Sequence, residues 1–148
     1  AAVVAVDFSG YDIVYLAGGW GAAFDLGTSA ELAHGMTQAN AAERVIGGVC
    51  HGPLGLLGAK GPDGGPLVTG RRLTAVTDKQ VRELGIESTP QHPERELRAA
   101  GALFEASSSF RDIFATHVVR DGRLITGQNQ NSGCATAQAM MRAIAGTD

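Results

Sequence analysis

The sequence contains few cysteines, no long hydrophobic run and no signal-peptide pattern at its start. Its two cysteines, Cys50 and Cys134, lie too far apart to suggest a disulfide framework, which favours a reducing compartment and predicts a cytoplasmic location. No apolar run approaches the roughly 20 residues that a membrane-spanning helix needs. We therefore expect no membrane partner for this chain.

The sequence also lacks an excess of charge of one sign. Its 12 Lys and Arg against 15 Asp and Glu give a net charge of −3, and the largest basic cluster is the pair Arg71-Arg72, so we expect no nucleic-acid partner. No pair of His, Cys, Asp or Glu has the spacing of a zinc site, so we expect no metal. The 44% of hydrophobic residues excludes disorder, and the length of 148 residues predicts a single domain over residues 1–148.

What the sequence does contain is a strand–turn–helix pattern around Cys50. Residues 44–49 predict a buried strand, Cys50-His51-Gly52-Pro53 predicts an abrupt turn, and residues 54–57 predict the start of a helix. This is the layout of a nucleophile elbow, in which a strained turn exposes a reactive atom. The helix is expected to favour the thiolate form of Cys50, and His51 can accept a proton.

Both polar residues of this turn have a plainer interpretation. A free cysteine at a strand end is commonly a small buried hydrophobe, and His51 can be a solvent-facing residue of the first helical turn. The small residues around Cys50, namely Gly47, Gly48 and Gly52, favour the elbow, because so tight a turn needs glycine on steric grounds.

The remaining histidines and the second cysteine carry weaker signals. We expect His34 to be exposed on a helix and His117 to be structural. His92 opens a charged helix, for which we expect a solvated face, with a lid or a subunit contact as alternatives. Cys134 begins the last helix and is expected to be inert.

Strand-like and helix-like segments alternate along the chain. This order predicts an α/β fold with a mostly parallel sheet covered by helices on both faces, and Asp121-Gly122 predicts an antiparallel hairpin at one edge. Thr28, with Glu31 three residues later, predicts a helix N-cap. We expect strands near residues 12–17, 44–49, 67–69, 72–77, 103–106, 116–120 and 124–126, and helices near residues 28–42, 54–57, 78–84, 93–100 and 132–145.

Four motifs in order resemble the DJ-1/PfpI (ThiJ) superfamily and, within it, the Hsp31-like branch, in which the catalytic Cys and His are adjacent. They are Tyr11–Gly21, Gly48–Pro53, Pro66–Thr74 and His117–Asn129, and they cover nearly the whole chain. The resemblance implies the flavodoxin-like, class I glutamine-amidotransferase-like fold. Relatives carry a preceding βαβ part with a glutamate that contacts the cysteine. We expect this chain to lack that part, and to associate with it or to form a homo-oligomer.

The resemblance also implies a pocket around Cys50. The backbone N–H groups of Gly19 and His51 are expected to form an oxyanion hole, with Gly18 setting the turn; a plain strand-to-loop turn is the alternative. Trp20 stands where relatives often have a histidine. We expect it either to narrow the pocket or to serve as a packing residue.

The acid that would orient the histidine is harder to assign. By the resemblance it falls near Val81, which cannot serve, and the nearest carboxylates are Asp78 and Glu83. Their alternatives are helix capping for Asp78 and a solvated helix face for Glu83. In PfpI-type relatives the acid can come from a neighbouring subunit. Asn129 or Gln130 is expected to line the pocket, or else to cap the last helix.

These features predict a cofactor-free enzyme in which Cys50 attacks a small reactive carbonyl. The resemblance implies glyoxalase III-like or deglycase-like chemistry, such as methylglyoxal to lactate. One alternative is a stress-response chaperone or a redox-sensing protein, since an exposed low-pKa thiol is readily oxidised. A PfpI-type amidase or peptidase is another. The last alternative is that the chain is a degenerate relative of the family with a weak site.

Overall fold

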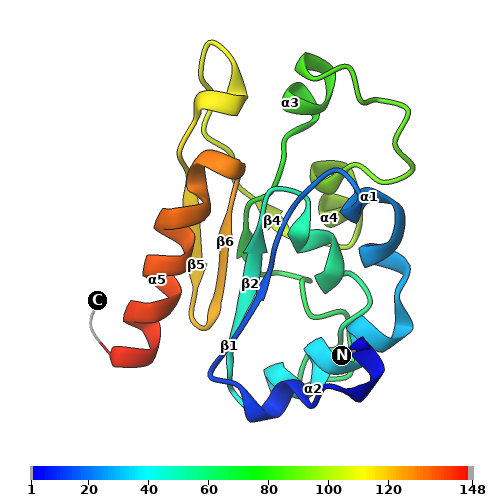
Figure 1. The fold of residues 1–148 in the computed structure, drawn as a ribbon, viewed down its shortest axis with the longest axis vertical. Coiled ribbons are helices and arrows are strands. Elements are labelled where there is room, and N and C mark those ends of the chain that lie inside the picture. Colours follow the sequence, from blue (N-terminus) through cyan, green and yellow to red (C-terminus); the bar gives the residue numbers. More distant parts are fainter. Residues whose placement is uncertain (1, 147–148) are drawn as a thin grey trace.

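The computed structural model describes residues 2–146. Within them, the main sheet has the strand order β1-β2-β6-β5 (Figure 1). Its strands are β1 (Ile13–Leu16), β2 (Val45–Val49), β5 (Val118–Asp121) and β6 (Leu124–Gly127). β1, β2 and β6 run parallel, and β5 pairs antiparallel with β6. The predicted α/β fold, with a mostly parallel sheet and an edge hairpin, is confirmed.

The other elements surround this sheet. A small second sheet pairs β3 (Arg72–Leu73) with β4 (Leu103–Phe104) in parallel. The α-helices are α1 (Ala22–Asp25), α2 (Ala30–Ala41), α3 (Asp78–Glu83), α4 (Pro93–Ala99) and α5 (Gly133–Ala145). The 3-10 segments are η1 (Val3–Ala5), η2 (Phe8–Gly10), η3 (Leu26–Thr28), η4 (Gly52–Leu56), η5 (Asp112–Phe114) and η6 (Gln130–Ser132). Among the described residues no helix is long and apolar enough to cross a membrane.

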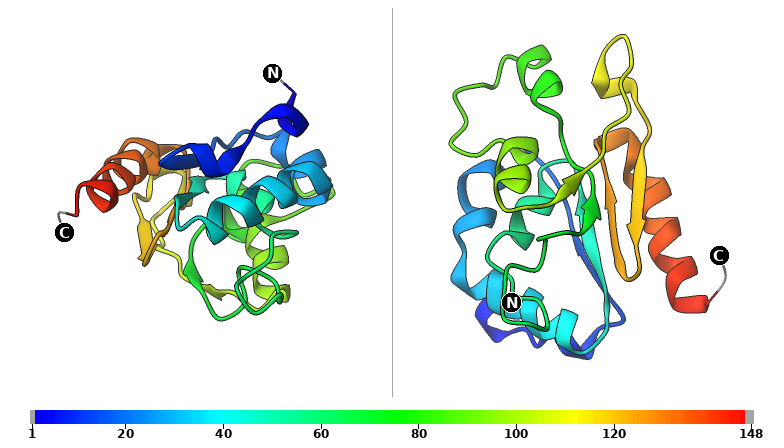
Figure 2. Two further views of the ribbon diagram at one scale, coloured as in Figure 1. Left: turned by 90° about the horizontal axis from the view of Figure 1, so that it is seen from below. Right: turned by 180° about the vertical axis from the view of Figure 1, so that it is seen from behind.

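Helices cover both faces of the main sheet, as the sequence predicts (Figure 2). α5 lies on one face, where Met140 packs with Val45 and Ile125. α2 and η4 lie on the other face, within a larger apolar cluster that includes Met36 and Leu56. The buried, small-residue strand β2 lies between these layers, so the chain that leaves its carboxyl end is held from both sides.

One predicted strand is absent and another is much shorter than expected. Residues 67–69 form a turn, in which the N–H of Thr69 bonds to Pro66 O at 3.2 Å. Only Arg72–Leu73 of the segment 72–77 pairs as a strand. Further along, the N–H of Thr74 bonds to Thr126 Oγ1 at 2.8 Å and the N–H of Val76 bonds to Cys50 O at 3.1 Å. These groups therefore serve the site rather than a strand ladder.

Three local predictions shift by a residue or change type. The N-cap of α2 is Ser29 rather than Thr28, because residues 26–28 already form a 3-10 turn; Ser29 Oγ accepts the N–H of Leu32 at 3.1 Å. The hairpin loop is residues 122–123, since Asp121 still pairs with Leu124. The helix predicted after the elbow is a 3-10 segment, because its sequence contains two glycines and a proline.

Candidate functional site

The backbone at Cys50 makes the predicted sharp turn. Cys50 directly follows β2 and has φ +62°, a left-handed conformation that costs a non-glycine residue of order 1–3 kcal/mol. Hydrogen bonds hold it in place: its N–H bonds to Gly127 O at 3.1 Å, and its carbonyl accepts the N–H of Val76 at 3.1 Å. The strained turn is thus fixed by β6 on one side and by the segment leading into α3 on the other.

The sulfur of Cys50 and the imidazole of His51 lie within contact distance. Sγ is 3.5 Å from Nδ1 of His51, close enough for the thiol to donate its proton to the ring. His51 is only 3% exposed, so its interpretation as a solvent-facing residue is wrong. Nε2 on the far side of the ring is buried and has no hydrogen-bond partner among residues 2–146.

The loop after β1 comes against this turn because it is made of glycine. A Cβ at Gly18 would lie 2.5 Å from Cys50 Cβ and 2.6 Å from Val49 O, both closer than real atoms approach. Gly19 has φ +126°, which side chains rarely allow. The backbone N–H groups of Gly19 and His51 interact with the sulfur of Cys50. These are the two backbone donors of the predicted oxyanion hole, which stays a prediction.

The electrostatics of the pair differ from the sequence prediction. Burial raises the pKa of the Cys50 thiol, and the N–H groups of His51 and Gly19 offset this only in part. This direction of the thiol pKa opposes the expected thiolate, which stays a prediction. The short 3-10 segment that follows supplies less of an N-terminal dipole than an α-helix would. Burial, and next the charge of His92, lower the pKa of His51. Both pKa directions favour a thiol beside a neutral imidazole over a thiolate–imidazolium pair.

The structure places Asp78 at the first position of α3 without making it the cap. Thr77 is the N-cap, with Oγ1 accepting the N–H of Gln80 at 3.0 Å, so the capping interpretation of Asp78 is wrong. Oδ1 of Asp78 is buried and has no hydrogen-bond partner among residues 2–146. Nδ1 of His92 lies 3.9 Å from this oxygen. Asp78 thus lies close to the site without a hydrogen bond to His51.

The other candidate acid is engaged elsewhere. Oε2 of Glu83 accepts the N–H of Asp112 at 2.9 Å, and Oε1 lies 3.7 Å from Lys79 Nζ. Glu83 therefore braces a loop, and the interpretation of a solvated helix face is wrong. Val81 is buried in an apolar cluster with Val76, against which Cys50 packs.

Asn129 is fully buried, and its amide braces the chain rather than facing a substrate. Nδ2 donates to the carbonyls of Asp112 and Ala115, both at 2.7 Å. Oδ1 accepts the N–H of Ser132 at 3.3 Å. Asn129 is thus the N-cap of the 3-10 segment η6, which leads into α5, whereas the N-cap of α5 itself is Ser132. Trp20 is 55% exposed, so it is not a buried packing residue.

Sequence reasoning missed two buried polar residues near the site and placed a third, His92, on the wrong face. Asp112 is 2% exposed, and its carboxylate accepts hydrogen bonds from Thr77 Oγ1 at 2.7 Å and Lys79 Nζ at 3.0 Å. Gln128 is fully buried and makes two hydrogen bonds with the backbone of Ser107, at 2.8 and 2.9 Å. His92, expected on a solvated face, is 7% exposed. Thr77, Lys79 and Ser107, which bind Asp112 and Gln128 in these contacts, lie 21 to 35 residues away, so no local pattern identifies these contacts.

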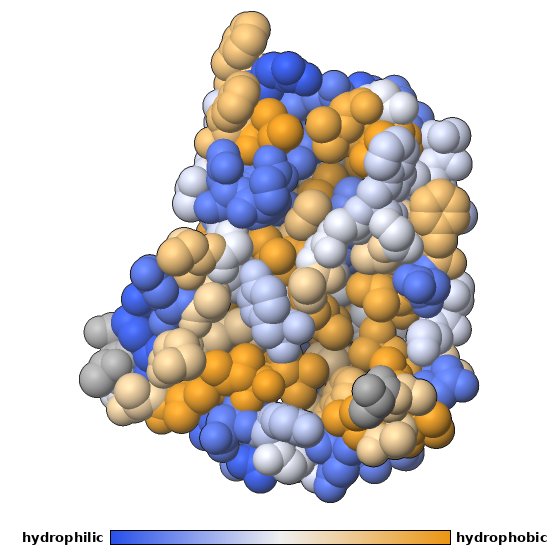
Figure 3. Space-filling view, viewed as in Figure 1, coloured by the Kyte–Doolittle hydropathy of each residue, from blue (hydrophilic) through white to orange (hydrophobic). Residues whose placement is uncertain are grey.

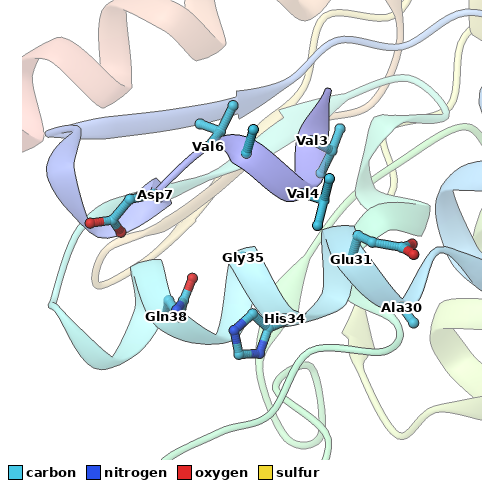
Figure 4. A pocket seen from close by; sticks show the side chains of 10 residues that line it. Val3, Val4, Val6, Asp7, Ala30, Glu31, His34, Gly35 and Gln38 are labelled. Carbon is cyan, nitrogen blue, oxygen red and sulfur yellow. The ribbon is translucent and has the colours of Figure 1, made fainter. Parts of the chain in front are cut away.

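One sizeable hollow lies away from this chemistry. A hollow of about 530 Å³ separates the N-terminal segment from α2, and Figure 4 shows Val3, Val4 and Val6 on one side and His34 and Gln38 on the helix. His34 is exposed there, as expected. Neither Cys50 nor His51 lines this hollow. Within the described part of the chain, no group of three or more His, Cys, Asp or Glu side chains could hold a metal ion.

Sequence comparisons identify relatives of this chain. The sequence model of the DJ-1/PfpI family matches residues 1–143. A Schizosaccharomyces pombe protein named a probable glutathione-independent glyoxalase is 33% identical over 143 residues, which cover 94% of this chain and 64% of that protein. A Candida albicans protein named glyoxalase 3 is 30% identical over 148 residues, which cover 93% of this chain and 60% of that protein.

Solved structures of similar proteins agree with these sequence matches. The crystal structure of glyoxalase III from Candida albicans superposes with a TM-score of 0.86 at 26% identity, over 95% of this chain and 60% of that one. A rapid encystment protein of Francisella tularensis gives a TM-score of 0.89 at 26% identity, over 97% and 63% of the two chains. The chain thus spans less than two thirds of the length of these relatives.

Proposed function

The chain belongs to the DJ-1/PfpI family, and from this we propose that it carries the cysteine site of a cofactor-free, glyoxalase III-like enzyme for small reactive carbonyls. The observation that carries the proposal is the elbow itself. Sγ of Cys50 lies 3.5 Å from Nδ1 of a buried His51, and the Gly18-Gly19 loop packs directly against the turn. Relatives named as a probable glutathione-independent glyoxalase and as glyoxalase 3 support the same chemistry. Deglycase-like activity would use the same first step.

The proposed reaction begins when Cys50 adds to the aldehyde carbon of methylglyoxal. His51 takes the thiol proton as the S–C bond forms, which gives a hemithioacetal whose oxygen the N–H groups of Gly19 and His51 would hold. A proton then moves from the former aldehyde carbon to the neighbouring ketone carbon, giving a thioester. Water cleaves the thioester to lactate and restores the thiol. One carbon is oxidised and its neighbour reduced, so no external redox cofactor is needed.

The neutral imidazole suits the role of base in this reaction. Because the thiol pKa is raised by burial, few Cys50 side chains are ionised near neutral pH, and the attacking thiolate must form as His51 accepts the proton. Because burial, and next the charge of His92, lower the pKa of His51, the ring is free to accept that proton. A half-buried thiol that stays protonated also reacts slowly with peroxide, which weighs against the redox-sensor alternative.

We propose that Asp78 is the carboxylate that orients His51. Two observations support this: Asp78 lies two residues after Val76, whose N–H binds the carbonyl of Cys50, and both Asp78 Oδ1 and His51 Nε2 are buried without a hydrogen-bond partner among residues 2–146. We also propose that Trp20, more than half exposed beyond Gly19, narrows the entrance to the site.

We further propose that residues 1–148 form one cytoplasmic domain that associates with another protein surface. Met141 and Ile144 of α5 are 64% and 45% exposed. Figure 3 shows hydrophobic residues gathered over β1 and the outer end of α5. The expected occupant is a second copy of this chain or the part of the relatives that this chain does not match. Light scattering on the purified chain, alone and with that part supplied, distinguishes the two.

Incubation with methylglyoxal in the absence of glutathione tests the proposed activity. We expect the chain to produce lactate, and the substitution Cys50→Ala to lower the rate by at least about 1,000-fold, because it removes the nucleophile. Cys134→Ala is the matched control, since Cys134 is an exposed thiol on α5, and its rate should be unchanged. Lactate formation that survives Cys50→Ala would contradict the proposal.

The alternative functions give different results in the same samples. A chaperone would make no lactate and would suppress aggregation of a client protein equally well with Ala at position 50. An amidase would hydrolyse peptide amides only when Cys50 is present, with no lactate from methylglyoxal.

A further inference from the structure

His92 is a second buried histidine whose hydrogen bond fixes its tautomer. It is 7% exposed and immediately precedes α4. Its Nε2 lies 3.1 Å from the carbonyl oxygen of Glu87. A carbonyl oxygen can only accept a hydrogen bond, so Nε2 must carry the proton. In the neutral ring, Nδ1 is therefore left with a bare lone pair.

That lone pair faces a carboxylate. Nδ1 of His92 is 3.9 Å from Oδ1 of Asp78, and the two side chains are 8% and 32% exposed. Two acceptors that face each other in a partly buried site repel, whereas a proton on Nδ1 turns the contact into an ion pair. Glu94 does not compete for the imidazole, because Oε2 accepts the N–H of Asp78 at 2.9 Å and Oε1 pairs with Arg98 at 3.0 Å.

The other charges around this pair lie on the surface. A hollow of about 220 Å³ at this point is lined by Asp78 and Arg82 of α3, Glu87 of the connecting loop, and His92 and Arg95. The side chains of Arg82, Glu87 and Arg95 are exposed, so water and salt screen them. Of these charged groups, Asp78 therefore has the strongest electrostatic interaction with the His92 ring.

The contact between His92 and Asp78 is tied to the Cys50 turn. Asp78 follows Val76 by two residues, and the N–H of Val76 bonds to the carbonyl of Cys50 at 3.1 Å. Thr77 between them caps α3 and fixes the direction of the segment. The positive charge of His92 also contributes, after burial, to lowering the pKa of His51. A charge on His92 therefore affects His51, the base of the proposed reaction.

We propose that His92 is a positioning residue of the Cys50 site: its ring contacts Asp78 and fixes that carboxylate beside the segment that binds the carbonyl of Cys50. The role of His92 in catalysis rests on the proposed function. Its test does not, because the test reads the protonation of histidine rings and needs no turnover. Failure of the glyoxalase assay would leave the titration result standing, and the reverse also holds.

Titration of the histidine rings by NMR in the isotopically labelled protein tests this proposal. The variant His92→Gln keeps an N–H donor for the carbonyl of Glu87 but cannot carry a charge. We expect the titration midpoint of His51 to move to higher pH in this variant, because a nearby positive charge has been removed. His34→Gln, on the exposed face of α2, is the matched control and should leave the midpoint of His51 unchanged.

Two results would overturn the proposal. The first is a midpoint of His51 that stays in place in a folded His92→Gln protein, which would make His92 a merely structural residue. The second needs no variant and therefore does not depend on its folding. Nitrogen chemical shifts of the wild-type protein report the tautomer of His92, which we expect to be protonated at Nε2 in the neutral ring. A proton on Nδ1 of the neutral ring would remove the basis of the inference.

Discussion

The Cys50 turn and the loop at residues 105–116 lie near each other, but they are built in opposite ways. The turn is made by the backbone: a left-handed cysteine, hydrogen bonds from main-chain groups and a glycine loop packed against it. The loop is held by buried polar side chains, chiefly Asp112, Gln128 and Asn129. The turn therefore depends on the absence of side chains, and the loop depends on their presence.

This difference predicts how each region responds to a destabilising substitution. An added methyl group has no room at the turn, and the neighbouring backbone cannot move away cheaply. In the loop, a lost charge leaves the shape intact but weakens several hydrogen bonds at once. The two regions can therefore be distinguished by two kinds of substitution. Adding one methyl group should disturb the turn, and replacing one carboxylate oxygen by an amide nitrogen should weaken the loop.

Of the substitutions that compare these two regions, Gly18→Ala is expected to have the largest combined effect on stability and activity. The new Cβ would lie 2.5 Å from Cys50 Cβ, so the loop must move and carry the N–H of Gly19 away from the sulfur. We expect a loss of about 1–3 kcal/mol in the free energy of unfolding and a drop of about 100-fold in lactate formation. Denaturant melts and the lactate assay measure the two effects.

Gly21→Ala is the matched control for this substitution. A Cβ at Gly21 would meet nothing within 4 Å, and φ there is −55°. We expect its stability and activity to stay close to those of the wild type. Equal behaviour of the two variants would show that close packing of the loop does not build the site.

A smaller effect is expected for Asp112→Asn. The carboxylate of Asp112 is nearly fully buried and accepts hydrogen bonds from Thr77 and Lys79, so losing its charge should cost about 2 kcal/mol of unfolding free energy. Asp12→Asn is the control. Its side chain is 79% exposed and lies 3.7 Å from Arg44, so we expect a change below about 0.5 kcal/mol.

The stability difference between wild type and Asp112→Asn should depend on pH. Burial raises the pKa of Asp112, but hydrogen bonds from Thr77, Lys79 and the N–H of Ser109 outweigh it, so the pKa lies below its usual 3.8. A lowered folded-state pKa contributes stability above the usual value and loses it as the pH falls through the folded-state value. The difference should therefore shrink below about pH 4. A difference that is constant over this range would contradict the role of the charge.

The same contrast explains what could be predicted from the sequence. Cys50, His51 and the two glycines of the loop belong to short local motifs, and strand order follows from the alternation of apolar segments. The bracing contacts are not local: Thr77 and Asp112 are 35 residues apart, and Gln128 and Ser107 are 21 apart. The local sequence around one residue of such a pair does not indicate which distant residue it contacts.

The wrong predictions have physical causes that a motif does not contain. The segment after the elbow is 3-10 rather than α-helical because of its glycines and proline, and this weakens the dipole invoked for the thiolate. Burial of the sulfur depends on Val76 and Val81, which approach from a distant segment. His92 was assigned to a solvated face by its charged neighbours, although the chain folds its ring inward.

The most direct test of this account is the pH dependence of Cys50 alkylation by iodoacetamide, measured in the Cys134→Ala background so that one thiol reacts. A thiol with a raised pKa should react faster with each rise in pH and show no plateau below about pH 8. A plateau between about pH 5 and 7 would reveal a preformed thiolate and contradict the thiol–imidazole pair on which the mechanism rests.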